Sequence, residues 1–195
     1  MHPARRAELT HQAGPIYAVN KCLLGAPKGG LKPSMSAKTN ALRILERAGI
    51  PFQIRLYELD EEHFSAERVS ALVGMAPETV FKTLIAHGDK TGYLFALIPA
   101  GTELDLRALA AVSGNKRVEL APLRDVLELT GYVRGAVTPL AAKRAYPVFV
   151  DETVELWPQV ALSGGQRGLQ LVLAPADLIR IAAAQLADIA RTPAG

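Results

Sequence analysis

Residues 79–86 read TVFKTLIA, a run rich in apolar and β-branched side chains that predicts a strand. With a period of two, Val80, Lys82 and Leu84 share one face of this strand, so a cation interrupts an apolar row. Burying an unpaired ammonium group is costly. Either the Lys82 side chain therefore extends to water, or its ammonium lines a polar cleft and meets an anionic or carbonyl group.

Short periodic patterns ended by glycine or proline continue on both sides of this strand. They predict helices that start at Thr39 or Asn40 and end at Gly49, and that span 65–73, 105–112, 123–129 and 175 to about 189. The other predicted strands are 52–59, 93–98, 117–120, 147–150, 159–162 and 168–173. Because strands and helices mix without a βαβ alternation, we expect an α+β domain with a mixed, curled sheet.

The composition is typical of one globular domain, with 195 residues of which 49% are hydrophobic and 21% charged. The single cysteine, Cys22, excludes an intramolecular disulfide and fits a reducing compartment. The longest apolar runs, such as 94–98 and 181–184, are far shorter than the roughly 20 residues of a membrane span. We therefore expect a soluble, cytoplasmic protein that does not bind membranes.

The positive charge is concentrated at the start of the chain. The formal net charge is +3, but residues 1–35 hold five basic residues and one acid, which leaves −1 for residues 36–195. Residues 1–35 also contain Gly-Pro and Gly-Gly pairs without a regular period, and we interpret them as a flexible extension before a domain at 36–191. Met35 directly precedes a good helix start, which motivates the hypothesis that natural translation begins there.

Motifs for ATP, metal or serine chemistry are incomplete. Residues 162–166, LSGGQ, match the signature peptide of ABC-type ATPases, but no G-x-x-x-x-G-K-[ST] phosphate loop precedes them. Ser163 is not part of a G-x-S-x-G elbow. The histidines are scattered and form no zinc motif; they are His2, His11, His63 and His87. We expect neither a metal nor another cofactor.

Two loops have two interpretations each. Residues 135–139, GAVTP, and 163–168, SGGQRG, carry glycines that either allow a simple turn or bring main-chain groups close to a ligand.

Six segments, taken in order, resemble the YbaK/EbsC family of freestanding Cys-tRNA(Pro) deacylases, which are related to the editing domain of bacterial prolyl-tRNA synthetase. The segments are Leu56-Tyr57-Glu58, His63-Phe64, Phe81-Lys82-Thr83-Leu84, Gly131-Tyr132-Val133, Gly135 to Pro139 and Ser163 to Leu169. The resemblance covers about residues 36–191. It implies an α+β fold with a barrel-like mixed sheet and a pocket for the aminoacylated 3′ end of tRNA.

The resemblance also implies roles for individual residues. It places Lys82, Gly135 and Thr138 in the catalytic site, and assigns substrate binding to Tyr57, Phe64, Thr83, Ser163 and Gly164. In this family the cysteinyl thiol attacks its own ester, so a metal and a catalytic triad are not needed. Lys82 would then favour the thiolate, or hold a phosphate or ribose; the sequence leaves both roles open.

The implied substrate is aminoacyl-tRNA(Pro), with prolyl-tRNA synthetase as a second partner. Candidate tRNA contacts, each also explained as a solvated surface charge, are Lys116, Arg117, Arg134, Lys143, Arg144 and Arg167. Thr138 replaces the family's usual serine, Ala136 a common glycine, and Gln170 and Val172 occupy positions that are often acidic. Thr138-Pro139 also resembles the alanine-specific branch, so an Ala-tRNA(Pro) deacylase is an alternative, although the SGGQRG loop favours the cysteine branch. A catalytically silent tRNA- or synthetase-binding module is the second alternative.

Overall fold

The computed structural model describes residues 38–58 and 65–193. Its helices are α1 (Asn40–Arg47), α2 (Ala66–Leu72), α3 (Leu106–Val112), α4 (Val126–Thr130) and α5 (Pro175–Ala182), with short 3-10 turns η2 (Pro77–Thr79), η3 (Leu123–Asp125) and η4 (Glu152–Leu156). Its strands are β1 (Gln53–Leu56), β2 (Val80–Gly88), β3 (Gly92–Pro99), β4 (Glu103–Leu104), β5 (Val118–Leu120), β6 (Val148–Asp151), β7 (Val160–Ser163), β8 (Leu169–Leu173), β9 (Gln185–Ala187) and β10 (Ala190–Arg191).

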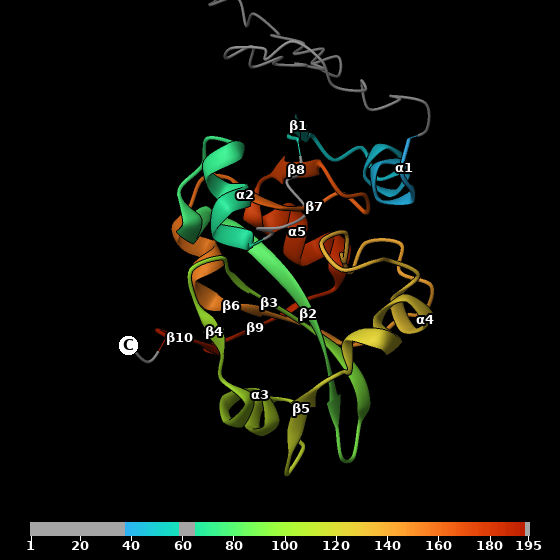
Figure 1. The fold of residues 1–195 in the computed structure, drawn as a ribbon, viewed down its shortest axis with the longest axis vertical. Helices are drawn as coiled ribbons and strands as arrows, with labels where there is room; N and C mark the ends of the chain where they lie inside the picture. Colours follow the sequence, from blue (N-terminus) through green and yellow to red (C-terminus); the bar gives the residue numbers. More distant parts are fainter. Residues whose placement is uncertain (1–37, 59–64, 194–195) are drawn as a thin grey trace, which may run out of the picture.

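Seven strands of the main sheet follow the order β1-β8-β7-β2-β3-β6-β9, and β5 joins as a further partner of β2. The sheet contains both parallel pairs (β2 with β7, β3 with β6, β6 with β9) and antiparallel ones, which confirms the predicted α+β class and mixed sheet. The order runs as an open path in the described part of the chain. The long hairpin of β2 and β3 crosses the molecule, with α2 beside its start and α3 and β5 towards its tip (Figure 1).

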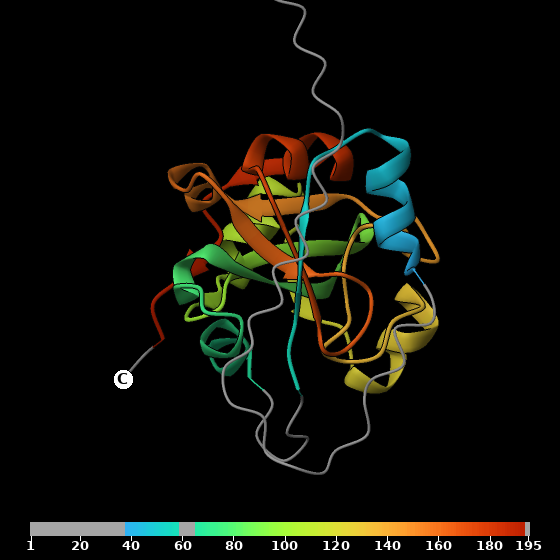
Figure 2. The same ribbon diagram turned by 90° about the horizontal axis from the view of Figure 1, so that it is seen from above.

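Both faces of the sheet are buried, because alternate side chains of β7 and β8 pack against different helices. Leu162 and Leu171 lie in one core cluster with Leu178 of α5. The intervening Ala161 and Val172 lie in another cluster that includes residues of α2. Helices α2 and α5 therefore cover opposite faces of these strands, as Figure 2 shows.

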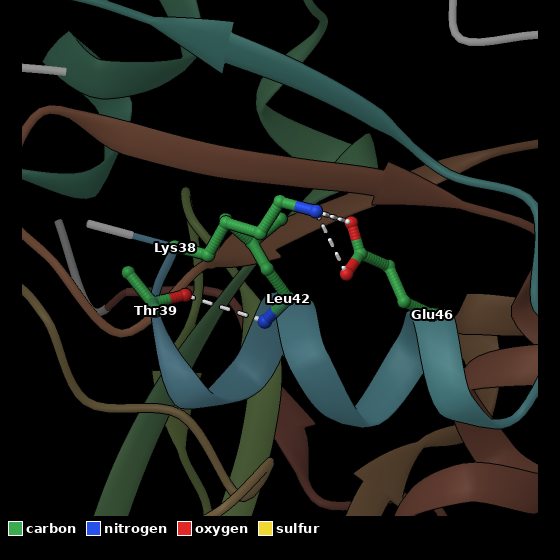
Figure 3. Close-up of polar contacts among 4 residues, drawn as sticks. All are labelled: Lys38, Thr39, Leu42 and Glu46. Atoms are coloured by element: carbon green, nitrogen blue, oxygen red, sulfur yellow. Dashed lines mark hydrogen bonds and ion pairs between the residues drawn. The ribbon is translucent and has the colours of Figure 1, made fainter. Parts of the chain in front are cut away.

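Helix α1 begins where the capping signal predicts. The Thr39 Oγ1 accepts a hydrogen bond from the Leu42 backbone N–H at 3.3 Å, which satisfies one of the free donors of the first turn (Figure 3). Lys38 Nζ reaches along the helix to Glu46 Oε1 at 2.8 Å. Leu42 and Leu45 are buried, so the apolar stripe of α1 packs on the core.

The predicted last helix, 175 to about 189, is wrong in its second half. Helix α5 ends at Ala182, and Ala183 follows in the left-handed region with φ 48°. Residues 185–187 then form β9, which pairs parallel with β6. The alanine-rich sequence favours a helix locally, but pairing with a distant strand outweighs that weak preference.

A buried carboxylate holds the segment that follows. Asp151 Oδ2 accepts the backbone N–H groups of Ile189 at 3.1 Å and Ala190 at 2.7 Å. This anchor leads into β10, which pairs with β4; neither short strand was predicted.

Three predictions lie outside the described residues: the extension at 1–35, the start at Met35 and the role of Phe64. No described helix has the length and hydropathy to cross a membrane.

Candidate functional site

A cavity of about 220 Å³ opens where strand β2 changes partners along one edge. On this edge, β7 pairs with β2 only at Val80 and Phe81, and β5 pairs with it only from Ala86 to Gly88. No described strand pairs with residues 82–84 on that side. The cavity lies there, between the start of α2, the loop at 134–137 and the ends of β7 and β8.

The sheet presents a polar row to this cavity. The row under α2 is apolar and consists of Val80, Ala161 and Val172. Two residues further along each strand, the same face carries Lys82, Ser163 and Gln170. All three of these residues line the cavity, so three neighbouring strands each contribute one polar side chain.

Lys82 is half-buried, and its ammonium is paired. Its Nζ donates to the backbone carbonyls of Ala100 at 3.0 Å and Thr102 at 2.6 Å, in the turn between β3 and β4. Burial lowers the pKa of Lys82 from its usual 10.5, and the negative charges of Glu67 and Glu103 oppose that shift. An ammonium has three N–H donors, so one remains beyond these two carbonyls.

The loop at 163–168 supports the site through two neighbouring residues with different roles. Ser163 is buried and lines the cavity; its Oγ accepts the Gly165 N–H at 3.3 Å, so its own O–H is available to donate. Gly164 does not line the cavity. A Cβ at Gly164 would overlap Leu169 Cδ2, so a larger residue fits there only if the Leu169 side chain moves. Gly164 therefore permits the loop to pack and acts indirectly.

In the loop at 135–139, too, one residue lines the cavity while another supports the loop. Gly135, with φ 85°, lines the cavity together with Val137. Thr138 is fully buried and does not line it; its Oγ1 accepts the Leu140 N–H at 3.4 Å. The structure thus places Thr138 behind the loop that borders the cavity, where it supports the turn.

Tyr57 and Thr83 carry hydroxyl groups at or near the cavity. Thr83 lines it, and its Oγ1 is buried without a hydrogen-bond partner. Tyr57 is 9% exposed and does not line the cavity. Burial raises the pKa of Tyr57, while the Gln170 side chain and the Gly168 backbone oppose the shift. The Tyr57 hydroxyl thus lies near Gln170, although it makes no hydrogen bond of good geometry.

Gln170 was not among the predicted site residues. It is 6% exposed, lines the cavity, and pairs across the sheet with Ser163. The signal that singled out Lys82 also exists here, because Gln170 is the one polar residue in the apolar strand Leu169–Leu173. What the sequence lacks is the register that aligns this residue with Lys82.

The predicted tRNA contacts do not form one patch. Arg134 lines the cavity, and its carbonyl accepts the Arg167 Nε–H at 2.8 Å, so these two arginines lie at the site. Lys116 and Arg117 precede β5, which pairs with the far end of β2, about 20 Å along the strand from Lys82. Lys143 and Arg144, in the segment after the 135–139 loop, are both exposed.

The described residues show no group of three or more His, Cys, Asp or Glu side chains that could hold a metal ion. His87, one of the scattered histidines, packs its ring edge-on against Tyr93 with 4.8 Å between the ring centroids.

Comparisons with known sequences give matches that extend over most of the chain. A profile of the aminoacyl-tRNA editing domain matches residues 60–181. EbsC of Enterococcus faecalis, whose proposed activity is Cys-tRNA(Pro)/Cys-tRNA(Cys) deacylation, is 38% identical over 158 residues, which are 81% of this chain and 96% of EbsC. ProXp-y of Escherichia coli K12, a multifunctional Ser/Thr-tRNA deacylase, is 28% identical over 155 residues, 77% of this chain and 91% of its own.

Solved structures show the same fold. A proposed trans-editing enzyme for prolyl tRNA synthetase superimposes with a TM-score of 0.69 at 26% identity, over 80% of this chain and 99% of that protein. The hypothetical protein APE2540 superimposes with a TM-score of 0.71 at 24% identity, over 78% of this chain and all of its own, 100%.

Proposed function

The chain belongs to the aminoacyl-tRNA editing domain family, and on this premise we propose that it releases cysteine from mischarged tRNA(Pro) in trans. The observation that carries the proposal is the polar row in the cavity, to which Lys82 of β2, Ser163 of β7 and Gln170 of β8 each contribute. An aminoacyl ester is already activated, so orientation and hydrogen-bond donors for the developing oxyanion are the main requirements.

The reaction uses the substrate's own thiol. The cysteinyl sulfur bonds to the ester carbonyl carbon, the bond from that carbon to the ribose oxygen breaks, and the thiol proton passes to the ribose oxygen. The products are free tRNA and a cyclic thioester, which water opens to cysteine. The remaining N–H of Lys82 and the O–H of Ser163 then donate hydrogen bonds to the carbonyl oxygen as its negative charge grows.

The charge on Lys82 also favours the thiolate form of the substrate, because a nearby cation lowers a thiol pKa. Its two backbone carbonyl partners hold the ammonium in place before the substrate arrives. Such preorganisation reduces the reorganisation that the reaction would otherwise require.

The remaining site residues position the substrate. Thr83 offers a hydroxyl at the unpaired edge of β2, and Gly135 brings its main chain to the cavity. Thr138 and Gly164 act through the loops they support. Tyr57 acts through Gln170, which it adjoins.

The tRNA backbone approaches over Arg134 and Arg167, which lie at the cavity. Lys143 and Arg144 extend this surface, whereas Lys116 and Arg117 lie too far along β2 to join it. Because residues 36–195 carry a formal charge of −1, electrostatic attraction to tRNA is weak. Prolyl-tRNA synthetase, holding the same tRNA, supplies the missing affinity.

The test is the release of labelled amino acid from tRNA(Pro) charged separately with cysteine, alanine, serine or proline, using the full chain. We expect release of cysteine far above the spontaneous rate, and no such release from Lys82→Ala. Cysteine release at the spontaneous rate would contradict the proposal. Selective release of alanine or serine would instead assign another editing specificity, and serine is included because ProXp-y is a Ser/Thr-tRNA deacylase. A tenfold rise in kcat/KM on adding prolyl-tRNA synthetase would support that partner.

A further inference from the structure

Buried polar atoms without partners gather at the cavity. In the part of the chain that the structure describes, four buried side-chain polar atoms lack a hydrogen bond: Tyr57 OH, Thr83 Oγ1, Trp157 Nε1 and Gln170 Oε1. Thr83 and Gln170 line the cavity, and Tyr57 adjoins Gln170. Such atoms are rare in folded proteins and call for an explanation, and a ligand that completes their hydrogen bonds provides one.

We propose that Gln170, positioned by Tyr57, selects aminoacyl groups whose small side chain carries a thiol or hydroxyl, and discriminates against the methyl group of alanine. This inference rests on the proposed function. A carboxamide both donates and accepts hydrogen bonds, as do a thiol and a hydroxyl. A methyl group in the same place leaves the buried carboxamide unpaired, and a site built around a polar group rejects the ligand that lacks it.

The position of Gln170 fits this role. It lies directly across the β7–β8 ladder from Ser163, about 5 Å away, and lines the same cavity as Lys82 of β2. An ester carbonyl held by Lys82 and Ser163 therefore places the amino-acid side chain next to Gln170. Val69 and Val80 complete this end of the cavity, so the surroundings are apolar and unsuited to a charged side chain.

Tyr57 is a positioning residue. It does not line the cavity, and its backbone N–H is bonded to the Gly168 carbonyl at 3.0 Å, which fixes the start of the side chain. Its hydroxyl is buried next to Gln170. Tyr57 thereby restricts the carboxamide to orientations in which a polar edge faces the cavity.

The relatives agree with a preference for thiol and hydroxyl side chains. The proposed activity of EbsC is on cysteinyl-tRNA, and ProXp-y is a deacylase of seryl- and threonyl-tRNA. All three amino acids carry a thiol or hydroxyl on a small side chain.

Binding of stable substrate analogues separates selectivity from chemistry. The probes are adenosine-ended acceptor-stem oligonucleotides that carry cysteine, serine or alanine through a 3′ amide, which cannot be released. For the full chain we expect the cysteine and serine probes to bind about tenfold or more tighter than the alanine probe, the range set by one unpaired buried polar group. Gln170→Met keeps the length of the side chain but removes its polar end, and should reduce this ratio to within about twofold.

Tyr57→Phe should reduce the ratio as well, although its own side chain does not reach the cavity. Gln185→Met is the matched control, because Gln185 is exposed on β9, and it should retain the full ratio. A ratio that stays unchanged in both Gln170→Met and Tyr57→Phe overturns the inference, even if all three probes bind more weakly. Tyr57→Phe alone decides the matter if Gln170→Met does not fold. Failure of the proposed function appears separately, as the absence of cysteine release by the unaltered chain.

Discussion

Replacing Lys82 by methionine tests the proposed catalytic centre most directly. Methionine keeps an unbranched chain but removes the ammonium that donates to the carbonyls of Ala100 and Thr102. Loss of one well-placed donor to a developing oxyanion costs about 2.7–4 kcal/mol in the transition state, or 10²–10³ in rate. We therefore expect single-turnover release of cysteine from Cys-tRNA(Pro) to fall by that factor.

The effect on stability should be much smaller. The two carbonyls lose a charged partner, but Lys82 is only half-buried, so water can replace it, and the burial cost of the charge disappears as well. A net change of about 1 kcal/mol corresponds to roughly 2–4 °C in Tm for a chain of this size. Thermal unfolding followed by circular dichroism verifies that the variant is folded. A folded Lys82→Met that retains release within about threefold of the unaltered chain would refute the reasoning.

The pH profile tests the role of the Lys82 charge without a substitution. Since burial lowers the pKa of Lys82 below 10.5, the active ammonium form is lost as pH rises through that lowered value. After subtraction of spontaneous hydrolysis, kcat/KM should fall on the alkaline side before pH 10.5 is reached. In Lys82→Arg the guanidinium stays charged, so the residual activity should lack this falling limb. Between the folded and unfolded pKa values the unfolded chain binds more protons, so the free energy of unfolding should rise with pH there.

Three further predictions concern the loop at Gly164, the tRNA surface and the buried Asp151. Gly164→Ala places a Cβ against Leu169 Cδ2, and we expect about 1–3 kcal/mol of destabilisation in urea unfolding; an unchanged midpoint would contradict the steric argument. Arg134→Ala should raise KM for tRNA and reduce the slope of log affinity against log salt concentration by about one. Lys116→Ala, at the far end of β2, should change neither quantity. Equal effects of the two substitutions would contradict the separation of the cavity arginines from the lysine before β5. Asp151→Asn removes the charge that binds the N–H groups of Ile189 and Ala190. The free energy of unfolding should therefore fall by about 1.5–3 kcal/mol, and Tm by several degrees. Cysteine release should be retained below that Tm, and its loss in the folded variant would show a direct role of Asp151.

Local patterns predicted most of the elements, because each is encoded within a few residues. The strand at 79–86 was recognised from its period, and α1 from the Thr39 cap. The end of α5 was not, since the turn at Ala183 and strand β9 depend on pairing with β6, about 35 residues earlier in the chain. A local propensity carries no record of such a partner.

The site was predictable to a similar degree. Lys82 stood out as a cation in an apolar row, and the structure places it in the cavity. Gln170 carried the same signal in its own strand, but its relevance depends on the β7–β8 register, which the sequence does not reveal. Glycines in the loops were recognised as important, but Gly135 borders the cavity and Gly164 only permits packing, a distinction that requires the neighbouring atoms.

The exchange of partners along β2 makes this sheet a fork, with β7 as one branch and β5 as the other. The cavity lies between these two branches, so its width depends on the angle between β7 and β5 as well as on the side chains that line it. That angle is set by packing at each branch, where α3 contacts β5 and α5 packs over β7 and β8. Substitutions far from the cavity can therefore widen or narrow it while every lining residue stays the same.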